Sequence, residues 1–217
     1  IWIINNFDIF NDDQKKFIDE IKKNYSISKI KGLFKKFENK KVLLVGETII
    51  DEYIFCDTIG KSGKEPMLVN KKIKSEKYVG GIIAVANHIA SFCKSIDVVS
   101  FIGSKNEELE LIKKNLKKNV KVNFVKKNNS PTIVKSRLID NYTKNKIIGI
   151  YDLNDENIDK DNELSFSKKI NKFIKSSDLT IVVDYGHGII TPKICKLLEN
   201  KSKFLAVNSQ LNSLNQS

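Results

Sequence analysis

The sequence predicts an α/β fold: a doubly wound, mostly parallel sheet flanked by helices, with a small β-hairpin lid. Short apolar runs that suit strands buried on both faces alternate with longer segments of helical periodicity. Two further pairs of strand-like runs are joined by polar turns instead of helices, which predicts hairpins. The 217 residues, 41% of them hydrophobic, are enough for one well-buried domain and an appendage.

The first strand of this sheet is predicted at the apolar run Val42–Val45, which Gly46 ends. Asp51 follows five residues after that glycine. In open α/β sheets ligands bind outside the carboxyl ends of the strands. We therefore expect Asp51 to lie where a substrate binds.

Residues 1–40 differ from the rest and predict a helical arm or linker ahead of a domain at 41–217. Asn11 is the expected cap of a first amphipathic helix, and Ser28 is the expected cap of a second one. Neither helix can bury its apolar face alone, so both need something to dock on. No residue of this segment suggests chemistry.

The other elements follow from the same rules. A diglycine, Gly80–Gly81, opens an apolar helix that reaches Ala90, and its backbone N–H groups could approach a ligand closely. The lid hairpins are expected at about 52–79 and 131–152. Further strands are expected at 97–103, 121–125, 179–184 and 203–208, and further helices at 106–116 after a Ser104 cap, at 161–176 with Leu164, Ile170, Phe173 and Ile174 buried, and after a Thr191 cap.

Charge and composition argue against nucleic-acid and membrane partners. The net charge is +12, but Arg137 is the only arginine and the lysines are spread over every segment, whereas nucleic-acid surfaces usually add arginine forks and stacking aromatics. The longest weakly polar run, 79–93, is too short to cross a bilayer. Three scattered cysteines suit a reducing cytoplasm. The chain begins with Ile1 and has no basic leader, so we expect it to be part of a longer protein.

Two nucleotide-binding motifs are excluded by their spacing. Gly60-Lys61-Ser62 is similar to the end of a P-loop, but the required earlier glycine is Phe55 here. The segment 46–51 does not supply the Gly-x-Gly-x-x-Gly of a dinucleotide-binding oxidoreductase.

An ordered set of motifs resembles the ribokinase-like (PfkB) carbohydrate kinases, most closely their heptose-phosphate kinase branch. The set covers roughly 41–210, although each motif alone is weak. It consists of Gly46–Asp51, the Glu65-Pro66 turn, Gly80-Gly81 with its Ala-rich helix, residues 131–137 (PTIVKSR) and residues 184–188 (DYGHG). The resemblance implies an ATP-dependent phosphoryl transfer to a hydroxyl of a sugar or sugar phosphate.

The resemblance also implies roles for particular residues. Asp51 would accept sugar hydroxyls, and Gly80 and Gly81 would present backbone to the sugar. Lys135 and Arg137 lie two apart on a strand, hence on one face, and would hold a phosphate that the sugar already carries. On the nucleotide and magnesium side the resemblance points to Asp184 and Asn208; His187 beside them is expected to be structural.

The chain departs from the family pattern in two places. The asparagine usual four residues after the first glycine of the helix is Ala84 here. No Gly-x-Gly-Asp turn, which in the family carries the general base, occurs in the sequence. We therefore expect no catalytic residue in this chain, the base and ATP-binding part beyond Ser217, and no sugar phosphorylation by the 217 residues alone. A non-catalytic sugar-phosphate-binding or regulatory module is the alternative.

The resemblance extends to cofactors and partners. ATP and Mg²⁺ are expected for the full-length protein. The resemblance also implies a homodimer formed through the β lid. The segment before Lys41 is similar to the connector in proteins that fuse a nucleotidyltransferase domain ahead of such a kinase.

Overall fold

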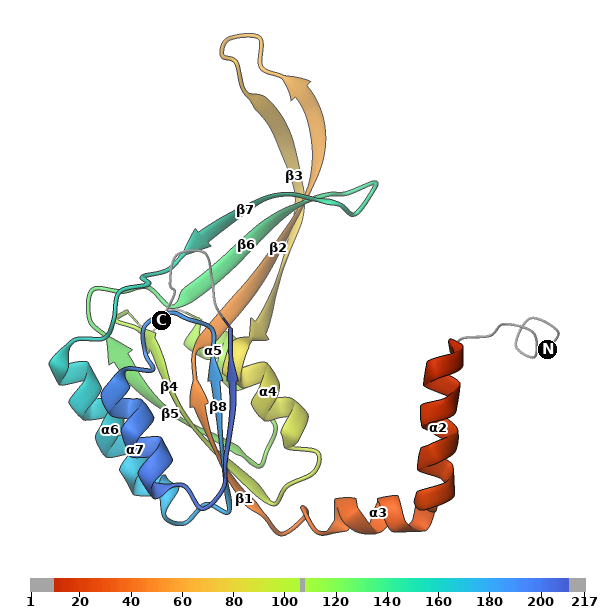
Figure 1. Ribbon diagram of the computed structural model, residues 1–217. Coiled ribbons are helices and arrows are strands. Elements are labelled where there is room, and N and C mark those ends of the chain that lie inside the picture. The colour runs from red at the N-terminus through yellow and green to blue at the C-terminus, as the bar shows by residue number, and fades with distance from the viewer. Residues whose placement is uncertain (1–9, 106–107, 211–217) are drawn as a thin grey trace. The chain divides into compact units, whose positions relative to one another are not determined.

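The computed structural model describes residues 10–105 and 108–210, and the chain divides into two compact units (Figure 1). The first unit ends at Asn39 and the second begins at Lys40. Each unit is described below by itself. The expected start of a helix at 106 lies outside the described residues.

The first unit consists of helices α2, Asp12–Asn24, and α3, Ile27–Lys35. Asn11 caps α2 in a capping box with Gln14, as the sequence predicts. The cap of α3 is Ser26, so the predicted Ser28 cap is wrong: a hydroxyl accepts best from the amide three residues on, here that of Lys29 at 3.1 Å.

The second unit is built on a parallel five-stranded sheet in the order β5-β4-β1-β8-β9. This order places the first strand in the centre, where both of its faces are buried (Figure 1). The predicted parallel α/β sheet is confirmed. Its strands are β1 Lys41–Gly46, β4 Ser95–Gly103, β5 Val120–Lys127, β8 Leu179–Asp184 and β9 Leu205–Ser209.

Successive residues of β1 point to opposite faces and so enter two separate cores. Val42 and Leu44 join the core under α4, Gly81–Ile89, and α5, Leu109–Lys114. Leu43 and Val45 join the core on the opposite face. There they pack against α6 Lys160–Ile174 and α7 Pro192–Lys201.

A second sheet of four strands, in the order β3-β2-β6-β7, forms the lid (Figure 1). β2 and β3 are an antiparallel hairpin, β6 and β7 are another, and β2 joins the two by pairing in parallel with β6. The expected hairpin layer is confirmed. The lid strands are β2 Thr48–Lys61, β3 Leu68–Gly80, β6 Ile133–Asp140 and β7 Lys146–Asp152.

Two helix predictions need correction. Ser104 does not cap α5, because the helix begins only at Leu109. The residue before it, Glu108, has a φ of 65°, and its carboxylate contacts Lys77. In α6 the buried stripe runs through Phe166, Ile170 and Ile174, while Leu164 is 48% exposed. The predicted Thr191 cap of α7 is confirmed by its hydrogen bond from the amide of Ile194.

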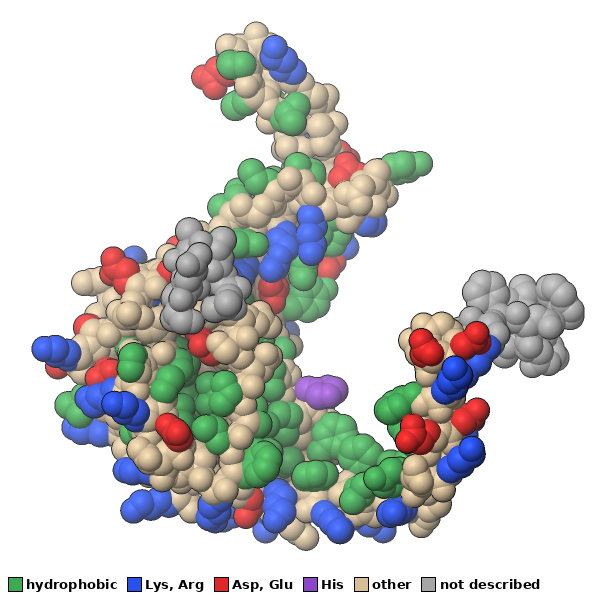
Figure 2. Space-filling view, viewed as in Figure 1, with side chains coloured by type: hydrophobic (Ala, Val, Ile, Leu, Met, Phe, Trp, Pro, Cys, Tyr) green, Lys and Arg blue, Asp and Glu red, His purple; other side chains and the backbone are tan. Residues whose placement is uncertain are grey.

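The surface of the face in view carries scattered Lys and Arg side chains, without one continuous basic stripe (Figure 2). Within residues 10–105 and 108–210, every helix is too short or too polar to span a bilayer.

Candidate functional site

The site lies at the edge where the central strands of the parallel sheet end. Glu47 directly follows β1, and Asp184 is the last residue of the neighbouring strand β8. The chain leaves this edge through β2, which carries Asp51 into the lid. Parallel strands bring their carboxyl ends to one edge, so residues far apart in sequence meet here.

Asp51 and Gly80 lie side by side, as the resemblance implies. The two residues are on the paired strands β2 and β3, and the space that a Cβ on Gly80 would need is occupied by Oδ2 of Asp51. Gly80 has extended backbone, with a φ of −109°. The glycine therefore leaves the space that the carboxylate occupies, while its backbone conformation is open to any residue.

Gly81 is required for a different reason. Its φ is +54°, and a Cβ there would overlap the carbonyl oxygen of Glu47. The same carbonyl accepts the backbone N–H of Ile82, in the first turn of α4, at 2.8 Å. The second glycine thus fixes the start of α4 against the end of β1.

Lys135 and Arg137 lie on β6 beside Asp51, on the same face of the lid. Lys135 is level with Asp51 in the strand register, and Nη1 of Arg137 donates to Oδ1 of Asp51 at 2.6 Å. Burial and the charge of Arg137 lower the pKa of Lys135. Of the five residues that the resemblance assigns to the sugar side, the structure thus gathers four around the Asp51 carboxylate, while Gly81 faces Glu47.

Aromatic residues that are not part of the family motifs surround these cations. The guanidinium carbon of Arg137 lies 5.7 Å from the ring centre of Tyr53 and 5.9 Å from that of Tyr151, and Nζ of Lys135 lies 5.7 Å from the ring centre of Tyr151. Tyr78 is level with Asp51 on the other side and packs edge-on against Tyr53. Strand parity could have indicated Tyr53, two residues from Asp51, but not the partner strand of Tyr151.

Glu47 is the main site residue that the sequence analysis missed. Its side chain is 1% exposed, and its two oxygens accept the backbone N–H groups of Tyr185 at 3.0 Å and His187 at 3.1 Å. Burial, with a further contribution from the charge of Asp184, raises the pKa of Glu47 to about 7. A carboxylate directly after a buried strand and its glycine was the available signal.

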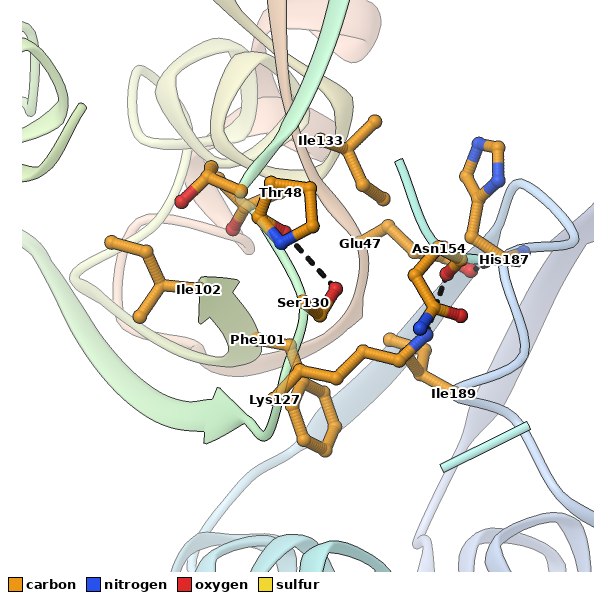
Figure 3. Close-up of a pocket in the computed structure, with 12 residues that line it drawn as sticks. Glu47, Thr48, Phe101, Ile102, Lys127, Ser130, Ile133, Asn154, His187 and Ile189 are labelled. Carbon is orange, nitrogen blue, oxygen red and sulfur yellow. Dashed lines mark hydrogen bonds between the residues drawn. The ribbon is translucent and has the colours of Figure 1, made fainter. Parts of the chain in front are cut away.

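Glu47 also lines a small pocket, whose surface is mostly apolar, with Lys127, Asn154 and His187 (Figure 3). Nζ of Lys127 donates to the carbonyl oxygens of Asn154 at 2.6 Å and Glu156 at 2.9 Å, and burial lowers its pKa. These contacts tie the segment after the lid to the end of β5.

His187 is buried, and the structural role expected for it stays a prediction. Its Nδ1 lies 2.5 Å from Oδ1 of Asp155, and burial lowers the pKa of the ring despite that carboxylate. With Nδ1 donating to Asp155, the neutral ring leaves Nε2 as a buried acceptor, which has no hydrogen-bond partner among the described residues.

Asp184 and Asn208 are not brought together. The carboxylate of Asp184 accepts from the backbone of Gly186 at 2.9 Å and from Oγ of Ser209 at 3.3 Å. Asn208 is exposed and level with Val183, so its side chain points to the opposite face of the sheet from Asp184.

The described residues do not form a metal site by themselves. In residues 10–105 and 108–210, no three His, Cys, Asp or Glu side chains are grouped closely enough to hold an ion. Asp184 offers a single carboxylate, so an ion held there would take most of its octahedral ligands from water and phosphate oxygens.

The curated relatives that match this chain are bifunctional proteins named HldE. The HldE of Aliarcobacter butzleri is 34% identical over 167 residues, which are 73% of this chain, and that of Campylobacter jejuni subsp. doylei is 28% identical over 172 residues, which are 78%. The chain spans about a third of the length of these relatives, 33% and 35%. No family model matches the chain.

Solved structures with the same fold include two phosphofructokinases. A possible 1-phosphofructokinase from Thermotoga maritima superimposes with a TM-score of 0.57 at 18% identity, over 78% of this chain and 54% of its own. Phosphofructokinase-2 from Escherichia coli, in complex with fructose-6-phosphate, gives a TM-score of 0.56 at 17% identity, over 81% and 56%. The chain is thus a homologue of part of the HldE proteins and has the fold of the ribokinase-like (PfkB) carbohydrate kinases.

Proposed function

We propose that this chain carries the acceptor side of a sugar-kinase site, in which Asp51 accepts the hydroxyls of a sugar or sugar phosphate. The observation that carries the proposal is the carboxylate of Asp51 lying directly against Gly80. A carboxylate has acceptor sites for two hydroxyl groups at once, and a glycine leaves the backbone open to a ring of a sugar. The HldE relatives and the phosphofructokinase neighbours support this assignment.

The full-length protein, in this proposal, transfers the γ-phosphoryl group of ATP to a hydroxyl of that sugar. Such transfer depends on positioning and on charge stabilisation, which ATP-bound Mg²⁺ supplies in kinases. The part taken by the described residues is to bind and orient the acceptor: Asp51 and the glycine doublet hold hydroxyls, and Lys135 and Arg137 hold a phosphate of the sugar. Asp184 and Asn208 stay assigned to the nucleotide side as a prediction.

The proposal also covers domain organisation, oligomeric state and compartment. The chain is the N-terminal portion of the kinase domain, with residues 1–40 as a connector to an upstream nucleotidyltransferase domain. Two copies pair through the lid, and the protein acts in the cytoplasm.

The proposal is tested with the full-length gene product, ATP, Mg²⁺ and a panel of sugars and sugar phosphates, by measuring ADP release. Asp51→Asn should lower kcat/KM at least about 100-fold, because a hydrogen-bonding group that positions the acceptor is lost. The matched control is Glu52→Gln, which removes the same charge from the next residue of β2, where the side chain points to the other face and accepts from Ser75 and Ser136. Equal activity of Asp51→Asn and Glu52→Gln would contradict the proposal.

A further inference from the structure

The carboxylate that is assigned to sugar hydroxyls already has a charged partner. Oδ1 of Asp51 accepts from Nη1 of Arg137 at 2.6 Å, while Oδ2 lies against Gly80. The side chains of Asp51 and Arg137 are 27% and 20% exposed. While Arg137 stays in place, it takes one of the acceptor sites of Oδ1 and pairs with the negative charge that would otherwise attract a sugar hydroxyl.

The arginine has donors to spare. A guanidinium carries five N–H groups, and both hydrogen bonds of Arg137 within the described chain, to Asp51 and to the carbonyl oxygen of Lys135 at 3.3 Å, use Nη1. Contacts with the rings of Tyr53 and Tyr151 support the guanidinium on either side. The donors on Nε and Nη2 are therefore available to a further acceptor.

A second cation, Lys135, lies beside this pair. Lys135 lies level with Asp51, with Nζ over the ring of Tyr151, and it makes no ion pair among the described residues. One carboxylate thus faces two cations. A surface hollow next to them is lined by Arg137, Gly149, Tyr151 and residues 146–148, where the missing side chain of Gly149 leaves room for the Tyr151 ring.

We propose that Arg137 exchanges partners: a bound phosphate group replaces Asp51 as the acceptor of its guanidinium. When a phosphate binds Lys135 and Arg137, the guanidinium turns from Asp51 to the phosphate oxygens, which match its planar fork better than a single carboxylate oxygen does. Oδ1 of Asp51 is then free for a sugar hydroxyl. Recognition of the two ends of one substrate is thereby coupled.

The coupling makes Arg137 a determinant of specificity. An unphosphorylated sugar that displaces Arg137 from Asp51 leaves the guanidinium without a charged partner, whereas a sugar phosphate supplies a new one. The role of Asp51 in this argument rests on the proposed function. The exchange itself does not, because phosphate alone should drive it.

The test uses inorganic phosphate as the probe and the whole 217-residue chain. Asp51→Asn removes the internal competitor for Arg137 and should bind phosphate about tenfold more tightly than the wild type, the equivalent of about 1.4 kcal/mol. Glu52→Gln removes one negative charge from the adjacent position on the opposite face, so it measures the general charge effect and should change the affinity less than about threefold. Arg137→Met should abolish phosphate binding in calorimetry.

A wild-type measurement keeps the inference testable if a variant does not fold. Arg137 is the only arginine, so arginine labelled with nitrogen-15 gives a single side-chain signal in the NMR spectrum. Phosphate should shift that signal saturably, and sulfate at equal ionic strength serves as the competing oxyanion. An unshifted signal, or Asp51→Asn binding phosphate no more tightly than Glu52→Gln, would overturn the inference; an Asp51→Asn enzyme that still phosphorylates sugars at the wild-type rate would instead overturn the proposed function.

Discussion

Glu47 binds two chain segments of the site, the start of α4 and the loop after β8, and it uses different atoms for each. Its backbone carbonyl holds the start of α4 through Ile82, and its carboxylate holds the loop after β8 through Tyr185 and His187. One residue thus links the helix after the lid hairpin to the loop after β8. Burial makes this carboxylate expensive to ionise, although the two backbone donors favour its charged form, and its protonation is therefore measurable.

Protonation of Glu47 should appear in the pH dependence of stability. The pKa is about 7 in the folded protein against an ordinary 4.5, so the folded state keeps a proton that the unfolded chain releases, and stability falls as the pH rises from about 4.5 to 7. The loss is on the order of 3 kcal/mol. Urea unfolding at pH 5 and pH 8 should show it in the wild type and not in Glu47→Gln.

The Glu47→Gln variant controls for the titration of other groups, which affects the stability of both proteins. His187 acts in the opposite direction, because burial lowers its pKa and the unfolded chain binds the extra proton at low pH. Since His187 is present in both proteins, the difference between the two curves isolates Glu47. Parallel curves would show that Glu47 does not titrate in this range.

Substitution of the two adjacent glycines should have two different effects, one on ligand binding and one on stability. Gly80→Ala forces the flexible carboxylate of Asp51 aside, so we expect loss of phosphate-sugar binding with less than about 1 kcal/mol of destabilisation. Gly81→Ala meets a backbone oxygen and a φ of +54°, which should cost about 2–4 kcal/mol of stability. Thermal unfolding and calorimetric binding of both variants separate the effects, and equal stability losses would contradict the assignment.

At the scale of elements, helix α6 shows how packing selects one face. The stripe Phe166, Ile170 and Ile174 is fully buried against the sheet, and the ring of Phe166 lies 4.7 Å from that of Phe101 on β4. A spacing of four residues along a helix puts such side chains on one face. Leu164 lies off this stripe and remains exposed.

Truncation of these side chains should therefore have unequal effects. Phe166→Ala leaves a cavity between α6 and β4 and should destabilise the protein by about 3–5 kcal/mol. Leu164→Ala, on the same helix and equally apolar, should cost less than about 0.5 kcal/mol. Urea unfolding measures both, and similar values for the two variants would show that α6 is rotated about its axis from the position described.

At the scale of the whole molecule, the two compact units have different means of stabilisation. The unit from Lys40 onward has two apolar cores, one on each face of its parallel sheet. In α2 and α3 no described residue is buried, and Phe17, Ile27 and Phe34 are exposed by 62%, 73% and 50%. The first unit therefore depends on local hydrogen bonds and caps.

Removal of residues 1–39 should leave the second unit intact. We expect the chain from Lys40 to Ser217 to unfold cooperatively, with a Tm within about 3 °C of that of the whole chain, because its cores are internal to it. Differential scanning calorimetry of both proteins checks this. A large drop in Tm would show that the first unit contributes to the stability of the second.

The sequence by itself determined the elements and half of the site. Apolar runs, caps such as Asn11 and Thr191, and the glycine doublet act through neighbouring residues, so their structure can be deduced locally. Only the tertiary structure decided the pairing of Asp51 with Arg137, across 86 positions, and the burial of Glu47 against a loop 138 positions away. Such contacts depend on strand order and register, which arise from burying two apolar faces at once and leave no periodic trace in the sequence.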